Sequence, residues 1–351
     1  MNLENRRIWQ QAAGDNNRNY VDLCLRWDVI LSGPGHHGHW SEGKQKLLEA
    51  GHSSKKVTNL RRFCEDILDG DLVVLRLGTS QIYSVGEVVG GYEWQDIFGD
   101  VDGWKLQHVR RVRWLWKDGD APKEFATHTL KFGDTTQELN SPDVMHWLQE
   151  LDVPPDVWDR SLVPLPSKPD EAPVKLGDIS EFLFDRGVAS YSVENLMREI
   201  NELIRIAKWY QKFDNNPSEF ETVAYLVIPL LRALGWTPQK MAIEWNRVDA
   251  ALFSDLPRDD NNLAVVVEAK KKDDSCLSAK SQAEAYAKTR QYCRRLIVTD
   301  GIRFGVYSKR NNSFYLYAYM NLTRLKASYP IYGCGGAKEA ILAMTPEWSK
   351  N

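Results

Sequence analysis

The sequence has little cysteine and no long apolar run. Its five cysteines are scattered through 351 residues and form no Cys-x-x-Cys pair. That distribution argues against a disulfide framework or a zinc–thiolate site and favours a reducing compartment. No stretch of 18 apolar residues occurs, so a membrane span is not expected, and the amino-terminal segment lacks the apolar core of a signal peptide. These absences predict a cytoplasmic protein with no membrane partner.

The chain also lacks an excess of positive charge, because its formal net charge is −3. This excludes a protein that coats nucleic acid through bulk electrostatic attraction, but not one with a local basic surface. Residues 1–160 carry 19 Lys and Arg against 25 Asp and Glu, and residues 161–351 carry 26 against 23. Nine of the 13 tryptophans also lie in the first 160 residues. The two halves are therefore expected to have different functions.

Proline marks the boundary between these halves. Six of the 15 prolines fall in residues 154–173, and proline continues neither a helix nor an inner strand. We expect a β-rich, Trp-rich recognition domain in residues 1–153 and a semi-extended linker in residues 154–177. A helical spacer and an α/β domain are expected in residues 178–351, with the core at about 214–320.

The first half is predicted to be a small mixed β-barrel. Apolar runs opened by turn residues indicate strands, and helical spacing indicates two short helices. The expected strands are Leu72–Leu77, Ile82–Val89 and Val109–Trp116, and the expected helices lie around Lys44–Leu48 and Lys55–Ile67.

The second half alternates helices and strands, which predicts a mixed central sheet flanked by helices, and hence an α/β (α+β) two-domain protein overall. Apolar residues at helical spacing indicate a helix over Val193–Phe213, a possible spacer or dimerisation helix. The other expected helices are Pro217–Leu234 and Ser278–Cys293, and the expected strands are Val248–Phe253, Leu263–Glu268, Leu296–Thr299, Phe304–Ser308 and Phe314–Tyr319.

Two of these strands carry acidic residues at matching ends. Asp249 opens one strand, and Glu268 and Lys270 close the next. Side chains alternate along a strand, so Glu268 and Lys270 are expected to face the same way. Carboxylate oxygens suit Mg²⁺, and a lysine beside the ion can position water or stabilise charge on phosphorus. A Glu-x-Lys pair alone is common at solvated strand ends, but here it ends a five-residue apolar strand that follows the Asp249 strand.

The segment from about Glu219 to Tyr307 resembles the PD-(D/E)xK nuclease superfamily, most of all the nuclease domain of type I restriction enzyme motor subunits. Five weak motifs occur in the family's order. They are the first helix with Glu219 and Pro229, the aspartate strand Arg247–Leu252, Val267-Glu268-Ala269-Lys270, the Gln282-x-x-x-Tyr286 helix, and the closing strands Leu296–Gly301 and Phe304–Tyr307. The sequence departs from the family in having no GxxxxGK[ST] motif, so ATP-driven translocation is not expected of it.

The resemblance implies Asp249 and Glu268 as ligands of Mg²⁺ or Mn²⁺, and Lys270 as the catalytic lysine. It also implies that Gln282 lies near the active site. Two residues compete for the family's helix glutamate. We favour Glu219 as the accessory carboxylate, because Ser218-x-x-Glu221 has the spacing of a capping box.

Basic residues follow these motifs. Lys271, Lys272, Arg290 and Arg294 would be solvated surface in most proteins, but beside a phosphodiester-cleaving edge they are candidates for contact with the nucleic-acid backbone.

The Trp-rich half suggests base recognition. Its strand rhythm loosely resembles the PUA-like group, including EVE and YTH domains, several of which hold a modified base in an aromatic cage. This resemblance implies Trp27, Trp40, Tyr83 and Trp94 as cage residues, with Asp96 and Asp102 as hydrogen-bond acceptors. His36, His37 and His39 occupy a Gly-rich stretch. It is interpreted as a flexible loop, because three histidines so close along the backbone make a poor tetrahedral site without outside ligands.

These features together predict a metal-dependent endonuclease of DNA, of the modification-dependent restriction or anti-phage type. It is expected to act as a homodimer, because double-strand cleavage needs two active sites. One alternative keeps the nuclease and makes the first half a sensor of a small nucleotide signal. Another is a nucleic-acid-binding protein whose nuclease fold is catalytically idle.

Overall fold

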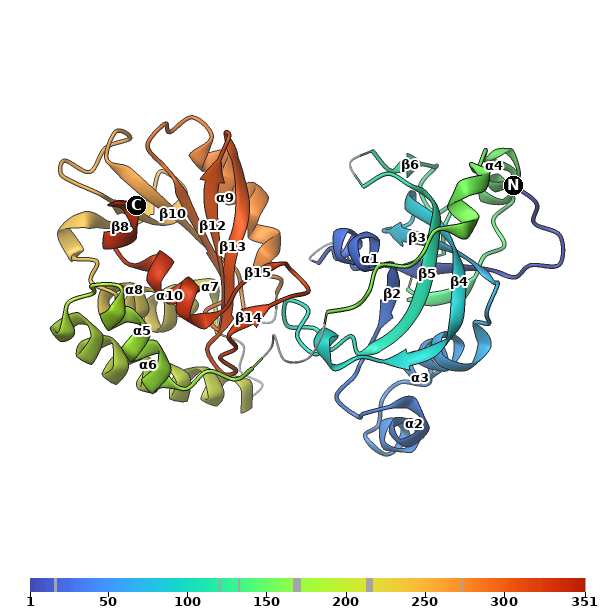
Figure 1. Cartoon of the computed structure of the whole chain (residues 1–351), viewed down its shortest axis with the longest axis horizontal. Coiled ribbons are helices and arrows are strands. Elements are labelled where there is room, and N and C mark those ends of the chain that lie inside the picture. The colour runs from blue at the N-terminus through green and yellow to red at the C-terminus, as the bar shows by residue number, and fades with distance from the viewer. Residues whose placement is uncertain are drawn as a thin grey trace. The chain divides into compact units, whose positions relative to one another are not determined.

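The computed structural model describes residues 1–15, 18–119, 121–131, 133–166, 172–212, 217–272 and 274–350. The chain divides into two units, Met1–Pro166 and Ser167–Asn351, each with its own sheet (Figure 1). None of the helices within the described ranges combines the length and the apolar character needed to cross a membrane.

The first unit is built on a seven-stranded sheet that curves like half of a barrel (Figure 1). The strand order is β2-β5-β4-β3-β1-β7, with β6 also pairing with β4. Among the strand pairs of the described residues in this unit, β1–β3 alone is parallel. Among the described residues no ladder joins β2 to β7, so the expected barrel is open. The strands are β1 (Ile8–Ala12), β2 (Val29–Ser32), β3 (Leu72–Leu77), β4 (Gln81–Trp94), β5 (His108–Lys117), β6 (Lys123–Glu124) and β7 (Thr136–Glu138).

Short helices complete the first unit, and the two that were predicted are confirmed. The first of them begins earlier than expected, because the His39 side chain accepts a hydrogen bond from the Ser41 amide and caps it. The core under β3 and β4 includes Leu72, Val74 and Val144. The helical segments are α1 (Val21–Trp27), α2 (Trp40–Glu49), α3 (Ser54–Arg61), the π-helical turn η1 (Arg62–Asp66), η2 (Asp96–Phe98), α4 (Pro142–Glu150) and η3 (Pro155–Asp159).

Most of the predicted proline-rich linker belongs to one unit or the other. The buried carboxylate of Asp28 accepts hydrogen bonds from Arg160 Nη2 at 2.8 Å and from the Val163 amide at 2.9 Å, which fixes the segment up to residue 166 on the first unit. On the other side, the amide of Val174 donates to the Leu325 carbonyl at 3.0 Å within the second unit. Residues 167–171 of the predicted linker lie outside the described residues.

The second unit is built on an eight-stranded mixed sheet of order β14-β15-β13-β12-β11-β10-β9-β8. Its β10–β11 and β13–β15 pairs are parallel, and the other pairs are antiparallel. The predicted mixed sheet is thus confirmed. The strands are β8 (Met241–Trp245), β9 (Val248–Phe253), β10 (Leu263–Ala269), β11 (Arg295–Thr299), β12 (Arg303–Arg310), β13 (Ser313–Asn321), β14 (Ser328–Tyr329) and β15 (Cys334–Gly335).

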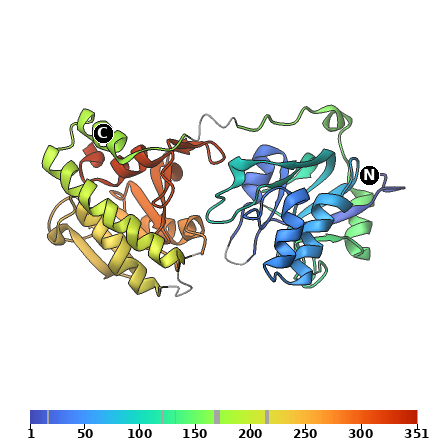
Figure 2. The same ribbon diagram turned by 90° about the horizontal axis from the view of Figure 1, so that it is seen from below.

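Helices cover both faces of this sheet. Helix α9 packs on the face that carries Val266 and Leu296, and α6, α8 and α10 pack on the face that carries Val265 and Ile297 (Figure 1, Figure 2). The helical segments are α5 (Leu176–Asp185), α6 (Ser190–Lys212), α7 (Glu219–Thr222), the π-helical turn η5 (Val223–Val227), α8 (Ile228–Ala233), η6 (Pro238–Lys240), η7 (Leu277–Ala279), α9 (Lys280–Ala287), α10 (Ala337–Met344) and η8 (Glu347–Lys350).

Two helix predictions need correction. The helix expected over Val193–Phe213 is no free spacer or dimerisation helix, because its apolar stripe lies in the core of the second unit; Phe213 itself is outside the described residues. The helix expected to reach Cys293 ends at Ala287, since the chain must turn back to enter β11 at Arg295. The buried stripe of α6 consists of Val193, Leu196, Ile200, Leu203, Ala207 and Tyr210.

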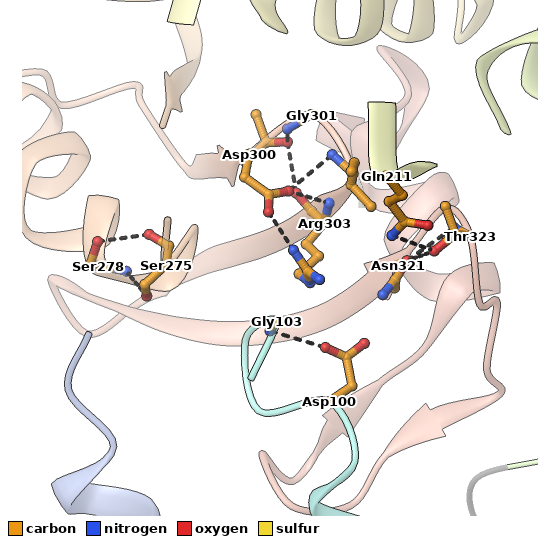
Figure 3. A network of polar contacts seen from close by, with 12 residues as sticks. Asp100, Gly103, Gln211, Ser275, Ser278, Asp300, Gly301, Arg303, Asn321 and Thr323 are labelled. Carbon is orange, nitrogen blue, oxygen red and sulfur yellow. Dashed lines mark hydrogen bonds and ion pairs between the residues drawn. The ribbon is translucent and has the colours of Figure 1, made fainter. Parts of the chain in front are cut away.

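The turn between β11 and β12 is fixed by a buried ion pair. Asp300 accepts hydrogen bonds from the Arg303 amide and from Arg303 Nη1, both at 2.6 Å (Figure 3). Gly301 in this turn has φ +81°, and a Cβ there would lie 2.7 Å from Thr222 Cγ2 and 2.8 Å from Leu226 Cδ1. Glycine therefore allows the helical stretch that begins at Glu219 to pack directly on the turn.

Replacing Gly301 with alanine tests this packing. We expect Gly301→Ala to lower the free energy of unfolding by about 2–4 kcal/mol, because backbone strain and a steric overlap add together. The control is Gly187→Ala, at φ +77° with no atom within 4 Å of the added Cβ, where strain alone acts. Urea denaturation measures both. Equal losses in the two variants would contradict a role for the close approach.

Candidate active site

Asp249 and Glu268 face each other across two central strands. The antiparallel register pairs Ala250 with Val267 and Ala251 with Val266, so Asp249 and Glu268 form the next opposed pair. Opposed residues of an antiparallel pair project from the same face. The amide of Ala269 donates to Asp249 Oδ2 at 2.7 Å, which fixes the aspartate against the end of β10.

Glu268 is the most deeply buried acid of the group, with a side chain only 1% exposed. Its Oε2 atom has no hydrogen-bond partner among the described residues, and its Oε1 atom lies 4.0 Å from Lys270 Nζ. Desolvation and the nearby Asp249 and Glu219 carboxylates, against the opposing effect of Lys270, together raise the pKa of Glu268 to about 8. The site therefore holds a carboxylate whose charge the protein alone does not neutralise.

Lys270 lies between this carboxylate and helix α9. Its Nζ atom donates to Gln282 Oε1 at 2.9 Å, and its backbone amide donates to the Thr299 carbonyl at 2.7 Å, at the end of β11. Gln282 is held in place because the small residues Ala283 and Ala287 of α9 pack against the sheet. Lys270 and Gln282 were both predicted from the sequence, and the structure brings them into direct contact.

Glu219 reaches the same place from another element. Desolvation raises its pKa, Asp249 raises it further, and Lys270 and Lys271 lower it, so its carboxylate feels these charges directly. Glu221, the competing residue, closes a capping box, in which its side chain accepts from the Ser218 amide at 2.8 Å. The capping box predicted for Ser218 and Glu221 is confirmed, and the role of Glu219 as accessory carboxylate stays a prediction.

The donor set fits a hard divalent cation. Asp249, Glu268 and Glu219 offer carboxylate oxygens, and the unpartnered Oε2 of Glu268 is an orphaned acceptor of the kind that a cation would satisfy. Desolvation also raises the pKa of Asp249, so burial disfavours the ionised form of both opposed acids. The carboxylates are less tightly gathered than His36, His37 and His52 of the first unit, whose ligand atoms all lie within 4.8 Å of one another.

The predicted basic contacts do not lie together. Lys271 and Arg294 are exposed, but Lys272 is buried at 7% exposure. The Arg290 guanidinium is held by Asp260 at 2.9 Å and lies over the Trp245 ring, with its side chain 12% exposed. Lys272 and Arg290 are therefore not placed to contact a nucleic-acid backbone as expected.

Arg294 lies at the end of β10 opposite to Glu268, since its amide donates to the Ala264 carbonyl. Glu268 lies four positions after Ala264 along β10, a distance of about 13 Å. Arg294 lines a hollow of about 510 Å³ whose other basic residues are Lys288 and Lys309. This basic hollow is separate from the acidic site.

The first unit gathers an aromatic cluster where β4 ends and β5 begins. Trp94 contacts the His108 ring edge-on at 5.1 Å and donates from Nε1 to Asp96 Oδ1 at 2.7 Å. The Tyr92 hydroxyl is 2.8 Å from His108 Nδ1 and accepts from the Trp40 amide at 3.3 Å. Trp40, Trp94 and Asp96, predicted as pocket residues, thus lie around Tyr92 and His108.

Other predicted cage residues lie elsewhere. In the β4–β5 ladder Ser84 pairs with Lys117 and Trp94 pairs with His108, so Tyr83 and Trp94 lie at opposite ends. Trp27 is the last residue of α1, which leads into the end of β2 that is remote from His108. The Trp27 carbonyl accepts a hydrogen bond from Arg111. Asp102 is buried in the loop before β5. A single cage holding both Tyr83 and Trp94 is therefore excluded.

Sequence reasoning missed several residues of these sites. Gly301 entered only as the last residue of the closing-strand motif, with no sign of its close packing, and Tyr92, His108 and His52 are isolated in the sequence. Trp40 was predicted as a cage residue; it is 6% exposed, and its indole nitrogen donates to Glu65 at 2.8 Å. Such contacts join residues far apart along the chain.

Comparison with known proteins adds one finding. Residues 9–136 match a family described as a domain of unknown function (DUF8426), which covers most of the first unit and none of the acidic site. None of the curated proteins matches the chain.

The buried Glu268 predicts an unusual pH dependence of stability. Its folded-state pKa of about 8 exceeds the ordinary glutamate value, so the unfolded chain releases this proton first. With chelator present, the free energy of unfolding is expected to fall as pH rises from about 5 to about 8, by up to about 1.4 kcal/mol per pH unit. Mg²⁺ should reduce the loss.

Urea denaturation across this pH range checks the prediction. Glu268→Gln removes the titrating group and should flatten the profile, whereas Glu194→Gln, on the exposed face of α6, should leave the wild-type slope. Identical slopes in wild type and Glu268→Gln would contradict the assignment.

Proposed function

We propose that the chain is a metal-dependent endonuclease that hydrolyses phosphodiester bonds of DNA, with the first unit recognising a modified base. The observation that carries the proposal is the grouping of Asp249, Glu268, Lys270 and Gln282 at one end of β9 and β10. A structural ion pair would not require an unpartnered buried carboxylate oxygen beside a second acid.

Asp249 and Glu268 would hold Mg²⁺ or Mn²⁺, which supplies Lewis-acid polarisation of the phosphoryl group. The Lys270 side chain is one-quarter exposed, and Gln282 orients its ammonium group, so that group can stabilise the negative charge that builds up on phosphorus. Glu219 adds a third carboxylate that can accept a hydrogen bond from the attacking water. As the water oxygen bonds to phosphorus, the bond from phosphorus to the leaving sugar oxygen breaks, and a proton passes to that oxygen.

Cleavage of phage DNA and of modified plasmid DNA with Mg²⁺ tests the proposal. Asp249→Ala and Lys270→Ala are expected to lower the cleavage rate by at least about 100-fold, because each removes charge stabilisation from the transition state. Lys208→Ala, an exposed lysine on α6, is the matched control and should cleave normally. Full activity in Asp249→Ala and Lys270→Ala would reject the mechanism.

The same assay separates the alternatives. Cleavage of unmodified DNA only after addition of a cyclic nucleotide would favour a signal-sensing first unit. Binding of Mg²⁺ without turnover on any DNA would favour an idle nuclease fold. Activity that rises with the square of protein concentration would support a homodimer, for which α6 no longer offers a free apolar face.

The base-recognition part rests on the aromatic cluster at the β4–β5 end. Trp94, which is half-buried, and Asp96, which is exposed, offer a stacking surface beside a hydrogen-bond acceptor. Tyr83 was expected in the same pocket but lies at the other end of the ladder, which makes it a matched control.

Binding to matched duplexes tests this part. The duplexes contain cytosine, 5-methylcytosine or 5-hydroxymethylcytosine, and the protein carries Glu268→Gln to prevent cleavage. Trp94→Ala is expected to weaken binding of the preferred duplex about 10-fold or more, since stacking on one base contributes about 1–3 kcal/mol. Tyr83→Ala should bind as the parent does. Equal losses in both variants would argue against a pocket at Trp94.

A further inference from the structure

Three histidines that flank helix α2 along the chain come together in the first unit. His36 and His37 lie in the β2–α2 loop, and His52 lies between α2 and α3. Their ligand nitrogens all lie within 4.8 Å of one another, and the Nε2 atoms of His37 and His52 are 3.0 Å apart. The sequence placed His39 beside His36 and His37, but His39 caps α2 instead, and His52 takes its place.

The β2–α2 loop is fixed by contacts of its own backbone. The Gly35 amide donates to the Lys105 carbonyl at 2.9 Å, and a Cβ on Gly35 would lie 1.9 Å from Gln107 Oε1. The Pro34 carbonyl is 3.3 Å from His108 Nε2. A Cβ on Gly43 of α2 would lie 3.3 Å from the His37 carbonyl. The loop is therefore held on both sides, so the histidines are brought together by the fold.

The donor set points to zinc. Imidazole nitrogens bind Zn²⁺ at about 2.0–2.1 Å, which puts two ligand nitrogens of a tetrahedral site about 3.3 Å apart. The separation between His37 and His52 is close to this, and neutral imidazoles suit Zn²⁺ rather than Mg²⁺. We propose that His36, His37 and His52 form a three-histidine Zn²⁺ site, in which a water or an anion completes the coordination.

The surrounding charges define the fourth ligand. Lys56 and Lys105 act on His36, and Lys46 and Lys56 act on His37. These lysines oppose a bare dication, so they favour an anionic fourth ligand such as hydroxide or a phosphate oxygen. His36 is exposed, which leaves that position open to solvent.

This site is independent of the proposed nuclease function. It lies within the matched domain of unknown function, in the first unit. A bound ion would tie the loop that leads into Trp40 to the far end of α2, and Trp40 contacts Tyr92 of the aromatic cluster. The ion would thus stiffen one border of that cluster.

Metal titration of the full-length chain tests the site. Metal-free protein is titrated with Zn²⁺ or Co²⁺ in excess Mg²⁺, and zinc content is measured by plasma mass spectrometry. Glu268→Gln is titrated in parallel, so that binding at the acidic site is recognised. We expect one Zn²⁺ per chain in wild type and in Glu268→Gln, with the Co²⁺ form showing visible bands of tetrahedral geometry.

Variants assign the ligands. His37→Ala and His52→Ala should weaken zinc binding by more than the roughly 10–100-fold cost of losing an outer partner of a ligand. His146→Ala, an exposed histidine on α4 paired with Glu150, is the control and should bind as wild type does. His52→Cys should keep the ion and add a thiolate-to-Co²⁺ charge-transfer band. No zinc bound by folded wild type, or equal affinity in His52→Ala, would overturn the proposal.

Discussion

The burial of one carboxylate, Glu268, is the constraint on which the acidic site depends. Strand β10 is buried along its whole length, so Glu268 is buried together with the apolar residues of the same strand. Removing a charged carboxylate from water costs free energy unless hydrogen bonds or an opposite charge replace the solvent. Here the facing residue is a second acid, Asp249, and Lys270 is too distant for a strong ion pair. The neighbourhood is thus arranged around a charge that it leaves unsatisfied.

The strands of the second unit could be predicted from the sequence because local pattern and burial agree there. Continuous apolar runs of three to five residues made β9, β10 and β11 recognisable. The opposed placement of Asp249 and Glu268 follows from one antiparallel register. The roles of the basic residues could not be predicted. Arg290 is occupied by Asp260 and Trp245, each about 30–45 positions away in the sequence, and no local pattern encodes such a pairing. The same holds for α6, whose apolar stripe has the same spacing whether it packs internally or against a partner.

The aromatic residues of the first unit show a second limit. Composition indicated that tryptophans gather there, but it contains no information about which end of a strand each occupies. Strand β4 runs on to Trp94, five residues past its expected end at Val89, and this extension separates Tyr83 from Trp94. The histidine cluster could not be predicted, because the sequence does not show which histidine caps α2. His39 caps it, and the third histidine of the cluster comes from the next loop, which only the folded chain identifies.

The π-helical turn η5 determines how the third carboxylate enters the acidic site. It lies between α7 and α8 in one continuous helical stretch, where Pro229 provides no amide for a regular ladder. A π-turn is equivalent to one residue inserted into an α-helix, and one residue rotates a helix by about 100°. The apolar anchor of α8 and the acidic start of α7 are therefore out of phase by that angle. This offset in helical phase sets the direction of the Glu219 side chain. Shortening η5 by one residue would therefore rotate Glu219 to another face of the helix, while α8 would keep its packing.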